Sequence, residues 1–205
     1  MTKDLEGALS AGVSPVKASE LDGITERAVA TAREAGVVDV SYTTTESPLG
    51  DLLVARTDRG LVRLIWLELG LDELLGELAE KVSPRVVEAA APLDDVRRQL
   101  DEYFAGARRE FDLDVDLALV GGFRRRALRS LAKVPYGELT TYKAVATSAG
   151  NERAVRAAGS AVGANPVPIV LPCHRVVRTG GALGGYGGGL DRKRYLLGLE
   201  GSLEA

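Results

Sequence analysis

The hydrophobic positions of this chain recur with two periods, and each period predicts its own kind of element. From residue 37 to residue 68, apolar and β-branched residues form three short runs separated by turn signals at 47–50 and 58–60. Such runs predict a small antiparallel sheet. Elsewhere apolar residues recur every three or four positions, which predicts helices with one apolar face. The predicted helices cover residues 18–35, 71–82, 92–104, 123–133, 141–148, 152–164 and 190–199.

Residues 111–117 alternate apolar side chains with Asp112, Asp114 and Asp116. This period of two predicts one further strand or an extended linker. Three carboxylates in a row raise the alternative of a metal site, but such a row is far more often the solvated face of a strand. We therefore expect no metal here.

The composition changes at Gly121-Gly122, and we place a domain boundary there. Residues 1–36 form a partly helical N-terminal extension, residues 37–120 an α/β domain that we expect to be scaffold, and residues 121–205 a mostly α-helical domain. In the last domain, two short helices joined by Ala149-Gly150-Asn151 are typical of a helix-turn-helix.

The formal net charge of −3 hides an asymmetry between two parts of the chain. Residues 1–121 carry 13 Lys and Arg against 24 Asp and Glu, a net charge of −11. Residues 122–205 carry 13 Lys and Arg against 5 Asp and Glu, a net charge of +8. This asymmetry favours a polyanionic partner for the second part; the alternative is that the two parts attract one another.

The composition also bounds the compartment and the cofactors. No apolar run approaches the roughly 20 residues that span a bilayer, and the charged N-terminus has no secretory signal. A single cysteine suits a reducing compartment, and one Cys with one His cannot supply the four ligands of a structural zinc site. We expect a cytoplasmic protein, nucleoid-associated if bacterial, that uses no membrane, metal or cofactor.

The candidate chemistry lies in the stretch Leu171–Val177, which holds the only cysteine, Cys173, and the only histidine, His174. A neighbouring imidazole or cation favours the thiolate, which is the reactive form of cysteine. The alternative is a small buried thiol beside a structural histidine. Prolines restrict the backbone before the pair, and seven glycines in the segment 180–189 make the backbone after it flexible. We therefore favour Cys173 as a nucleophile. The segment 180–189, which carries Tyr186, is then a mobile wing or lid over it.

The predicted helix 152–164 is built almost entirely of small residues, and Arg156 is the one long cation that can reach out from it. Small residues allow close approach, either to a narrow groove or to another helix. The spacing leaves two interpretations open: Arg156 reaches a ligand, or it is a surface arginine on a tightly packed core helix.

At these residues the chain resembles a known family. The segments PYGELTTY, NERAVRAAGSAVGANPVP and LPCHRVV, followed by a Gly-Tyr-Gly-Gly segment, resemble the O6-alkylguanine-DNA alkyltransferases over about residues 37–205. The resemblance implies an α/β domain of ribonuclease H-like fold followed by a mostly α winged helix-turn-helix domain. It also implies direct-reversal DNA repair, in which the alkyl group of O6-alkylguanine passes irreversibly to one cysteine, once per molecule. O4-alkylthymine is left open as a second substrate.

The resemblance assigns the catalytic roles by position. Cys173 looks like the alkyl acceptor, His174 like the base that activates the thiol through a bound water, and Glu200 like the carboxylate that orients the histidine. Asn165 resembles the residue that stabilises the turn before the site. Tyr142 resembles the tyrosine that helps to rotate the target phosphate, and it is a candidate proton donor to the departing guanine.

The resemblance also implies a double-stranded DNA partner containing O6-alkylguanine, bound through the minor groove by a monomer; cooperative assembly stays open. The residues implied to contact DNA or flip the base are Arg156, Ala157, Gly159, Tyr142 and Arg175. The residues implied to line the substrate pocket are Tyr186, Gly187, Gly188, Val176 and Pro168. The chain departs from the family at Gly187, where serine is common, and in residues 1–36, which have no counterpart.

Three competing functions differ from alkyl transfer. A non-catalytic sensor of alkylated DNA would lack the cysteine, which this chain has. A cysteine hydrolase would need Cys and His to converge from separate segments. A helix-turn-helix regulator would need long polar side chains on its second helix to read base edges, where this chain offers Ala and Gly.

Overall fold

The structure is a computed structural model that describes residues 18–203. The chain divides into two compact units, residues 1–37 and residues 38–205. The first unit contains helix α2 (Ala18–Glu34), which confirms the helix predicted at 18–35. Among the described residues, no helix is both long and apolar enough to cross a bilayer.

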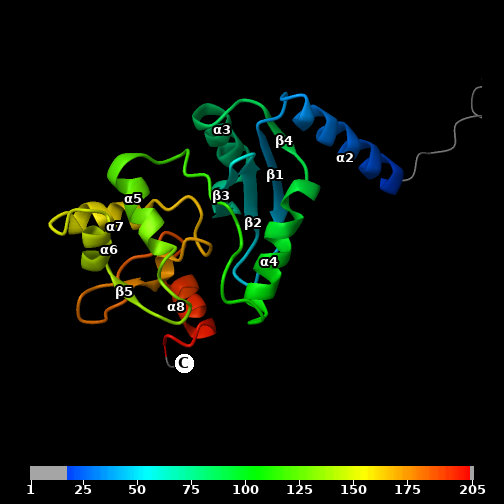
Figure 1. Cartoon of the computed structure of the whole chain (residues 1–205). Coiled ribbons are helices and arrows are strands. Elements are labelled where there is room, and N and C mark those ends of the chain that lie inside the picture. The colour runs from blue at the N-terminus through cyan, green and yellow to red at the C-terminus, as the bar shows by residue number, and fades with distance from the viewer. Residues whose placement is uncertain (1–17, 204–205) are drawn as a thin grey trace, which may run out of the picture. The chain divides into compact units, whose positions relative to one another are not determined.

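The second unit begins with a four-stranded sheet (Figure 1). Its strands are β1 (Val40–Thr45), β2 (Leu52–Thr57), β3 (Gly60–Trp66) and β4 (Val86–Glu88), in the order β3-β2-β1-β4. The pairings β1–β2 and β2–β3 are antiparallel, which confirms the predicted sheet, whereas β4 pairs with β1 in parallel. Strand β4 was missed because three residues are too few to display a period.

Helices cover both faces of this sheet because alternate side chains of β2 enter two different cores. Leu52 and Val54 lie in one cluster with residues of α4 (Asp94–Phe104), and Leu53 and Ala55 lie in another with residues of α3 (Leu71–Lys81). Short 3-10 turns, η1 (Leu67–Leu69) and η2 (Ala91–Leu93), precede these helices. The expected strand-helix pattern of the first domain is therefore confirmed.

The segment 111–117 is an extended linker and not a solvated strand. Its one bridge to the sheet joins Val115 to Leu61. Asp112 and Asp114 are exposed, but Asp116 is buried and accepts hydrogen bonds from Thr57 Oγ1 (2.7 Å) and Arg59 Nε (3.1 Å). The described residues contain no cluster of three or more His, Cys, Asp or Glu side chains that could hold a metal ion.

The remaining residues form the mostly helical part of the unit. Its elements are α5 (Gly122–Leu131), β5 (Thr140–Thr141), α6 (Tyr142–Ser148), α7 (Val155–Gly163), η3 (Cys173–Arg175), β6 (Val176–Val177) and α8 (Leu190–Leu199). Thr141 caps α6, because its Oγ1 accepts a hydrogen bond from Ala144 N (3.1 Å). Helix α7 begins three residues later than predicted, because the Asn151 side chain accepts from Arg153 N (3.1 Å) in a turn.

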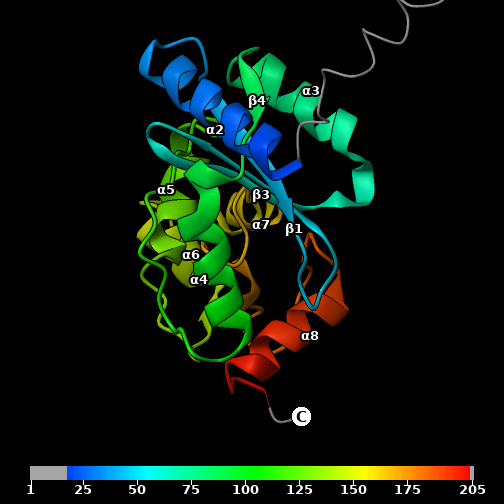
Figure 2. The ribbon, with the colours of Figure 1, turned by 90° about the vertical axis from the view of Figure 1, so that its right-hand side faces the viewer.

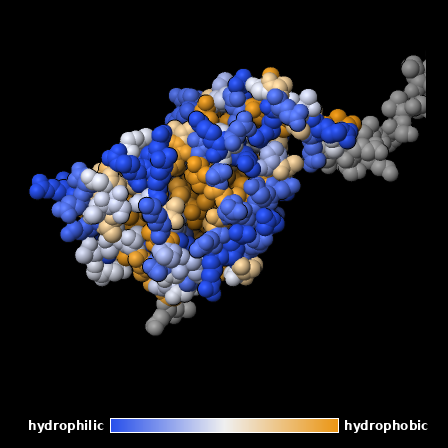
Figure 3. All heavy atoms as spheres, viewed as in Figure 1, coloured by the Kyte–Doolittle hydropathy of each residue, from blue (hydrophilic) through white to orange (hydrophobic). Residues whose placement is uncertain are grey.

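The two parts of residues 38–205 share one core. Leu64 of β3 belongs to the same buried cluster as Leu128 of α5, Val145 of α6 and Ile169. Figure 2 shows α5, α6 and α7 gathered behind α4 in the turned view. Figure 3 shows hydrophobic residues in a hollow in the middle of the visible face, with hydrophilic residues around it. The candidate nucleophile, Cys173, also belongs to this shared core.

Candidate active site

A braced loop brings Cys173 into position. Asn165 Nδ2 donates to Leu171 O (2.7 Å), and Asn165 Oδ1 accepts from Val167 N (3.1 Å), so one side chain spans the turn. Within this turn Ile169 has a φ of 73° and is 1% exposed. A β-branched residue at positive φ costs about 1–3 kcal/mol, so the packing around this loop over-determines its shape.

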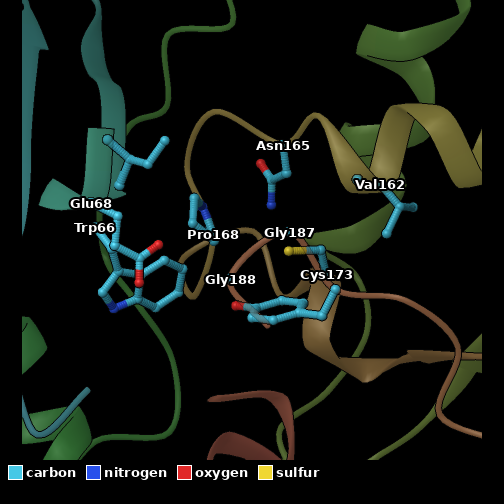
Figure 4. A pocket seen from close by; sticks show the side chains of 11 residues that line it. Trp66, Glu68, Val162, Asn165, Pro168, Cys173, Gly187 and Gly188 are labelled. Atoms are coloured by element: carbon cyan, nitrogen blue, oxygen red, sulfur yellow. The ribbon is translucent and has the colours of Figure 1, made fainter. Parts of the chain in front are cut away.

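Cys173 lies at the start of η3 and is 4% exposed. It lines a pocket of about 240 Å³, and Figure 4 shows its sulfur pointing into that pocket. Burial raises the pKa of the thiol to about 11, although a hydrogen bond from Asn165 and the charge of Lys193 act to lower it. At neutral pH the resting side chain is therefore a thiol, and ionisation needs a base.

His174 and Glu200 form a buried pair behind the cysteine. His174 Nε2 lies 2.8 Å from Glu200 Oε1, and neither side chain is exposed. The carboxylate also accepts from Arg175 Nε and Nη2 (2.8 Å each) and from Tyr103 Oη (2.7 Å). Glu200 is thus the centre of a network whose donors come from η3 and from α4 of the first domain.

The network determines the protonation states. Burial alone would raise the pKa of Glu200, but hydrogen bonds and charges from His174 and Arg175 outweigh it and lower this pKa to about 2. Burial lowers the pKa of His174, so its imidazole is neutral at pH 7. Since the carboxylate can only accept, Nε2 carries the proton and Nδ1 keeps a lone pair. Nδ1 is buried and has no hydrogen-bond partner in the part of the chain that the structure describes.

Lys193 is a site residue that the sequence did not single out. It is completely buried, and its Nζ donates to Val176 O (2.6 Å) and to Leu183 O. Burial lowers its pKa to about 8, which leaves it mostly cationic at neutral pH. It stands in a run of three basic residues, and only the packing of α8 on η3 reveals its burial.

The first domain also contributes directly to the site, which corrects the expectation that it is only scaffold. Ile65 and Trp66 of β3 and Glu68 of η1 line the pocket together with Cys173. Tyr103 of α4 holds Glu200. No local pattern marked these four residues, because their role depends on how the two parts of residues 38–205 pack.

Most of the residues predicted to form the pocket are brought together. Pro168, Tyr186, Gly187 and Gly188 line it with Asn165 and Cys173. A Cβ added to Gly187 would lie 3.1 Å from Gly163 O, so serine there would require a small shift of the backbone.

Two predicted residues lie elsewhere. Val176 is completely buried and does not line the pocket; its carbonyl oxygen accepts from Lys193. Arg175, which the resemblance implied as a DNA contact, is 6% exposed and is held by Glu200 and by Val134 O (2.5 Å). The correction has a simple cause: the charge of Arg175 neutralises a buried carboxylate.

The wing is tied to the body by several hydrogen bonds. Tyr142 Oη donates to Gly185 O (3.3 Å), Lys193 Nζ to Leu183 O, and Arg192 Nη1 to Gly188 O (3.1 Å). At Gly184, with a φ of 68°, an added Cβ would lie 2.9 Å from the Tyr142 hydroxyl oxygen. The glycines therefore let the wing approach Tyr142 closely.

Helix α7 serves both interpretations of its small residues. Ala158, Ala161 and Val162 are buried, and Gly159 lies under the ring of Tyr142, where an added Cβ would be 3.8 Å away. Arg156 is exposed on the opposite side, and Ala157 is exposed too. The helix thus packs closely on one side and presents a bare surface with one long cation on the other.

Glu200 makes the stability of the protein sensitive to acid. Its folded-state pKa of about 2 lies below its ordinary value of 4.5, so its stabilising effect is complete above pH 4.5 and is lost as the pH falls toward 2. We expect this group to contribute about 3 kcal/mol at neutral pH. Between pH 4.5 and pH 2, the free energy of unfolding measured with urea should fall more for the wild type than for Glu200→Gln. Parallel curves would contradict this assignment.

Comparison with known proteins covers both parts of residues 38–205. The family described as "6-O-methylguanine DNA methyltransferase, DNA binding domain" matches residues 122–202, and the family described as "6-O-methylguanine DNA methyltransferase, ribonuclease-like domain" matches residues 40–117. A curated relative, the methylated-DNA–protein-cysteine methyltransferase of Methanosarcina barkeri, is 40% identical over 160 residues, which cover 78% of this chain and 96% of the relative.

Solved structures agree. The crystal structure of Mycobacterium tuberculosis O6-methylguanine methyltransferase is 38% identical and matches with a TM-score of 0.68, covering 81% of this chain and 95% of that one. The structure of Mycobacterium tuberculosis OGT in complex with DNA is 38% identical with a TM-score of 0.67, covering 79% of this chain and 93% of that one. The predicted fold class and the predicted family resemblance are confirmed.

Proposed function

Because this chain belongs to the family of methylated-DNA–protein-cysteine methyltransferases, we propose that it repairs DNA by transferring the alkyl group of O6-alkylguanine to Cys173. The observation that carries the proposal is a cysteine whose sulfur points into a pocket, backed by a buried His174–Glu200 pair. The wing and helix α7 both line this pocket, through Tyr186 to Gly188 and through Val162 and Gly163. The chain contains no second thiol that could accept the group.

The reaction is a displacement at the alkyl carbon. A bond forms between Cys173 Sγ and that carbon, the bond from the carbon to guanine O6 breaks, and the proton lost by the thiol is balanced by a proton gained by the guanine. The product is a thioether, which has no ready reversal. One protein molecule therefore repairs one base.

His174 removes the thiol proton. Its Nδ1 keeps a lone pair, and a bridging water, as the family resemblance implies, relays the proton from Sγ to it. The imidazolium that forms is stabilised by Glu200, whose low pKa keeps it ionised. Lys193, which lowers the pKa of Cys173 by its charge, stabilises the thiolate.

Two tyrosines attend the departing guanine. Burial, and then the nearby Cys173, raise the pKa values of Tyr142 and Tyr186, so both hydroxyl groups keep their protons at neutral pH. The Tyr186 hydroxyl is buried beside Cys173 and makes no hydrogen bond to any other described residue, which suits it to bind the flipped base. Tyr142 is our candidate proton donor to O6.

The base must leave the duplex to reach Cys173, because its alkyl carbon is hidden in the stack. We propose that the bare side of α7 docks in the minor groove and that Arg156 fills the gap that the flipped base leaves. The charge of +8 on residues 122–205 supplies sequence-independent contacts with phosphates. Arg175 is excluded from that set by its burial.

Arg156→Ala is expected to slow transfer from an O6-methylguanine duplex by roughly 10²-fold, because no side chain then offsets the few kcal/mol needed to unstack the base. Transfer from the free base O6-benzylguanine, which needs no flipping, should change less than about threefold. Arg98→Ala removes an exposed arginine of α4 that makes only a surface ion pair with Glu102, and it is the matched control. Equal losses with duplex and free base would contradict the role of Arg156.

The deciding experiment incubates the protein with a duplex that contains one O6-methylguanine and weighs the intact protein. A gain of one methyl group, mapped to Cys173, supports the proposal. An unmodified protein that binds the lesion duplex more tightly than an undamaged one would be a sensor. Equal binding to both duplexes without modification would favour a helix-turn-helix regulator.

A further inference from the structure

The wall of the pocket that faces Cys173 comes from the first domain. Figure 4 shows the Cys173 sulfur pointing into the pocket, with Trp66 and Glu68 on the far side. The pocket volume of about 240 Å³ is below the roughly 300–1,000 Å³ of most small-molecule pockets. A base and its alkyl group therefore compete for limited room, and the far wall bounds that room.

Trp66 is fixed in this wall by tight packing. It is 4% exposed, and its ring meets the ring of Tyr186 edge to face, with centroids 6.2 Å apart. A Cβ added to Gly188 would lie only 2.6 Å from Trp66 Cζ3. The indole therefore has no space to swing toward the wing and make way for a larger ligand.

Arg192 of α8 also holds the indole. Its guanidinium lies 4.6 Å from the centroid of Trp66, a cation–π distance. The same guanidinium donates to Leu49 O (2.9 Å) and Gly188 O (3.1 Å) and forms an ion pair with Glu68. One side chain thus joins the turn before β2, the end of β3 and the wing.

We propose that Trp66, clamped by Arg192, is a specificity-determining residue that sets the largest alkyl group Cys173 can accept. This inference rests on the proposed function. A wall that could move would admit large groups with little loss of free energy. Trp66 cannot move easily, because the Tyr186 ring, the Arg192 guanidinium and the backbone at Gly188 pack against it. Groups larger than the space before the indole must displace all three.

The test compares second-order transfer rates for O6-methylguanine and O6-benzylguanine placed in the same duplex. Trp66→Ala is expected to raise the benzyl-to-methyl rate ratio by at least about tenfold, since misfits in a pocket change relative rates by 10-fold to 200-fold. Trp66→Phe, which keeps a smaller ring and is the safer variant for folding, should raise the ratio by less. Arg192→Met should also raise it, because the indole loses its clamp.

Leu64→Ala is the matched control. Leu64 lies on the same strand, is completely buried and does not line the pocket. The benzyl-to-methyl rate ratio of Leu64→Ala should stay within about twofold of the wild-type ratio. An equal rise with Leu64→Ala would mean that loosening of the core, and not the wall, governs size, and would overturn the inference.

The two proposals fail in different ways. If the wild type transfers no methyl group to Cys173, the proposed function is wrong. If the wild type transfers it, and the folded Trp66→Ala and Trp66→Phe variants keep the wild-type ratio, only the role of Trp66 is wrong. Thermal melts of each variant establish which of them are folded.

Discussion

Cys173→Ser is expected to abolish alkyl transfer, with a loss of roughly 10⁴-fold or more, the order seen when a covalent nucleophile is removed. A serine hydroxyl is a far weaker nucleophile than a thiol, and the neutral His174 is too weak a base to ionise it. The wild-type thiol already has a pKa raised to about 11 by burial, so a group that ionises less readily stays protonated.

Binding separates the loss of chemistry from a loss of folding. Serine is close to cysteine in size, so the free energy of unfolding of Cys173→Ser should stay within about 1–2 kcal/mol of the wild-type value. The variant should also still bind the lesion duplex. Intact mass and a gel shift on the same sample measure both properties. A methylated Cys173→Ser protein would show that the acceptor lies elsewhere, and would contradict the mechanism.

Glu200→Gln is expected to reduce both stability and rate. The carboxylate is buried and accepts hydrogen bonds from three side chains, those of His174, Arg175 and Tyr103. Glutamine leaves the buried charge of Arg175 uncompensated and places an amide N–H against these donors. Breaking such a buried pair costs about 3–5 kcal/mol. The transfer rate should fall by about 10²-fold or more, because the imidazolium loses its partner.

A rate profile distinguishes positioning from loosening. Glu200 acts through His174, so Glu200→Gln should shift the pH dependence of transfer, which a general loss of packing would leave unchanged. Asp191→Asn is the control: this carboxylate lies in the first turn of α8, the helix that Glu200 follows, is fully exposed and pairs only with Arg194 in the described structure. It should change the free energy of unfolding by less than about 0.5 kcal/mol. An unshifted profile for Glu200→Gln would contradict the positioning role.

Local patterns of the chain were sufficient for most elements. The period of three to four positions located α3, α4 and α5 to within a few residues, because each of these helices has one apolar face. Strand β4 and the late start of α7 were missed. A three-residue strand and an asparagine turn depend on the neighbours that pair with them, and the sequence pattern does not name those neighbours.

The sequence by itself was sufficient to propose the nucleophile and to predict the backbone around it. Cys173 and His174 are adjacent and unique, and prolines and glycines around them restrict the backbone over a few residues. These are short-range effects, which a linear pattern records. The sequence also predicts the bare surface of α7. Because nearly all residues of this helix are small, whichever face is exposed carries few large side chains.

Only the tertiary structure decided how that chemistry is enclosed. It buried Lys193 and Arg175, because each of these cations neutralises or satisfies buried polar groups. Trp66 and Cys173 are some hundred residues apart in the sequence, and only the tertiary structure shows that they line the same pocket. The free energy of such contacts depends on which faces pack together. Residues from all parts of the core, distant in sequence, decide which faces pack.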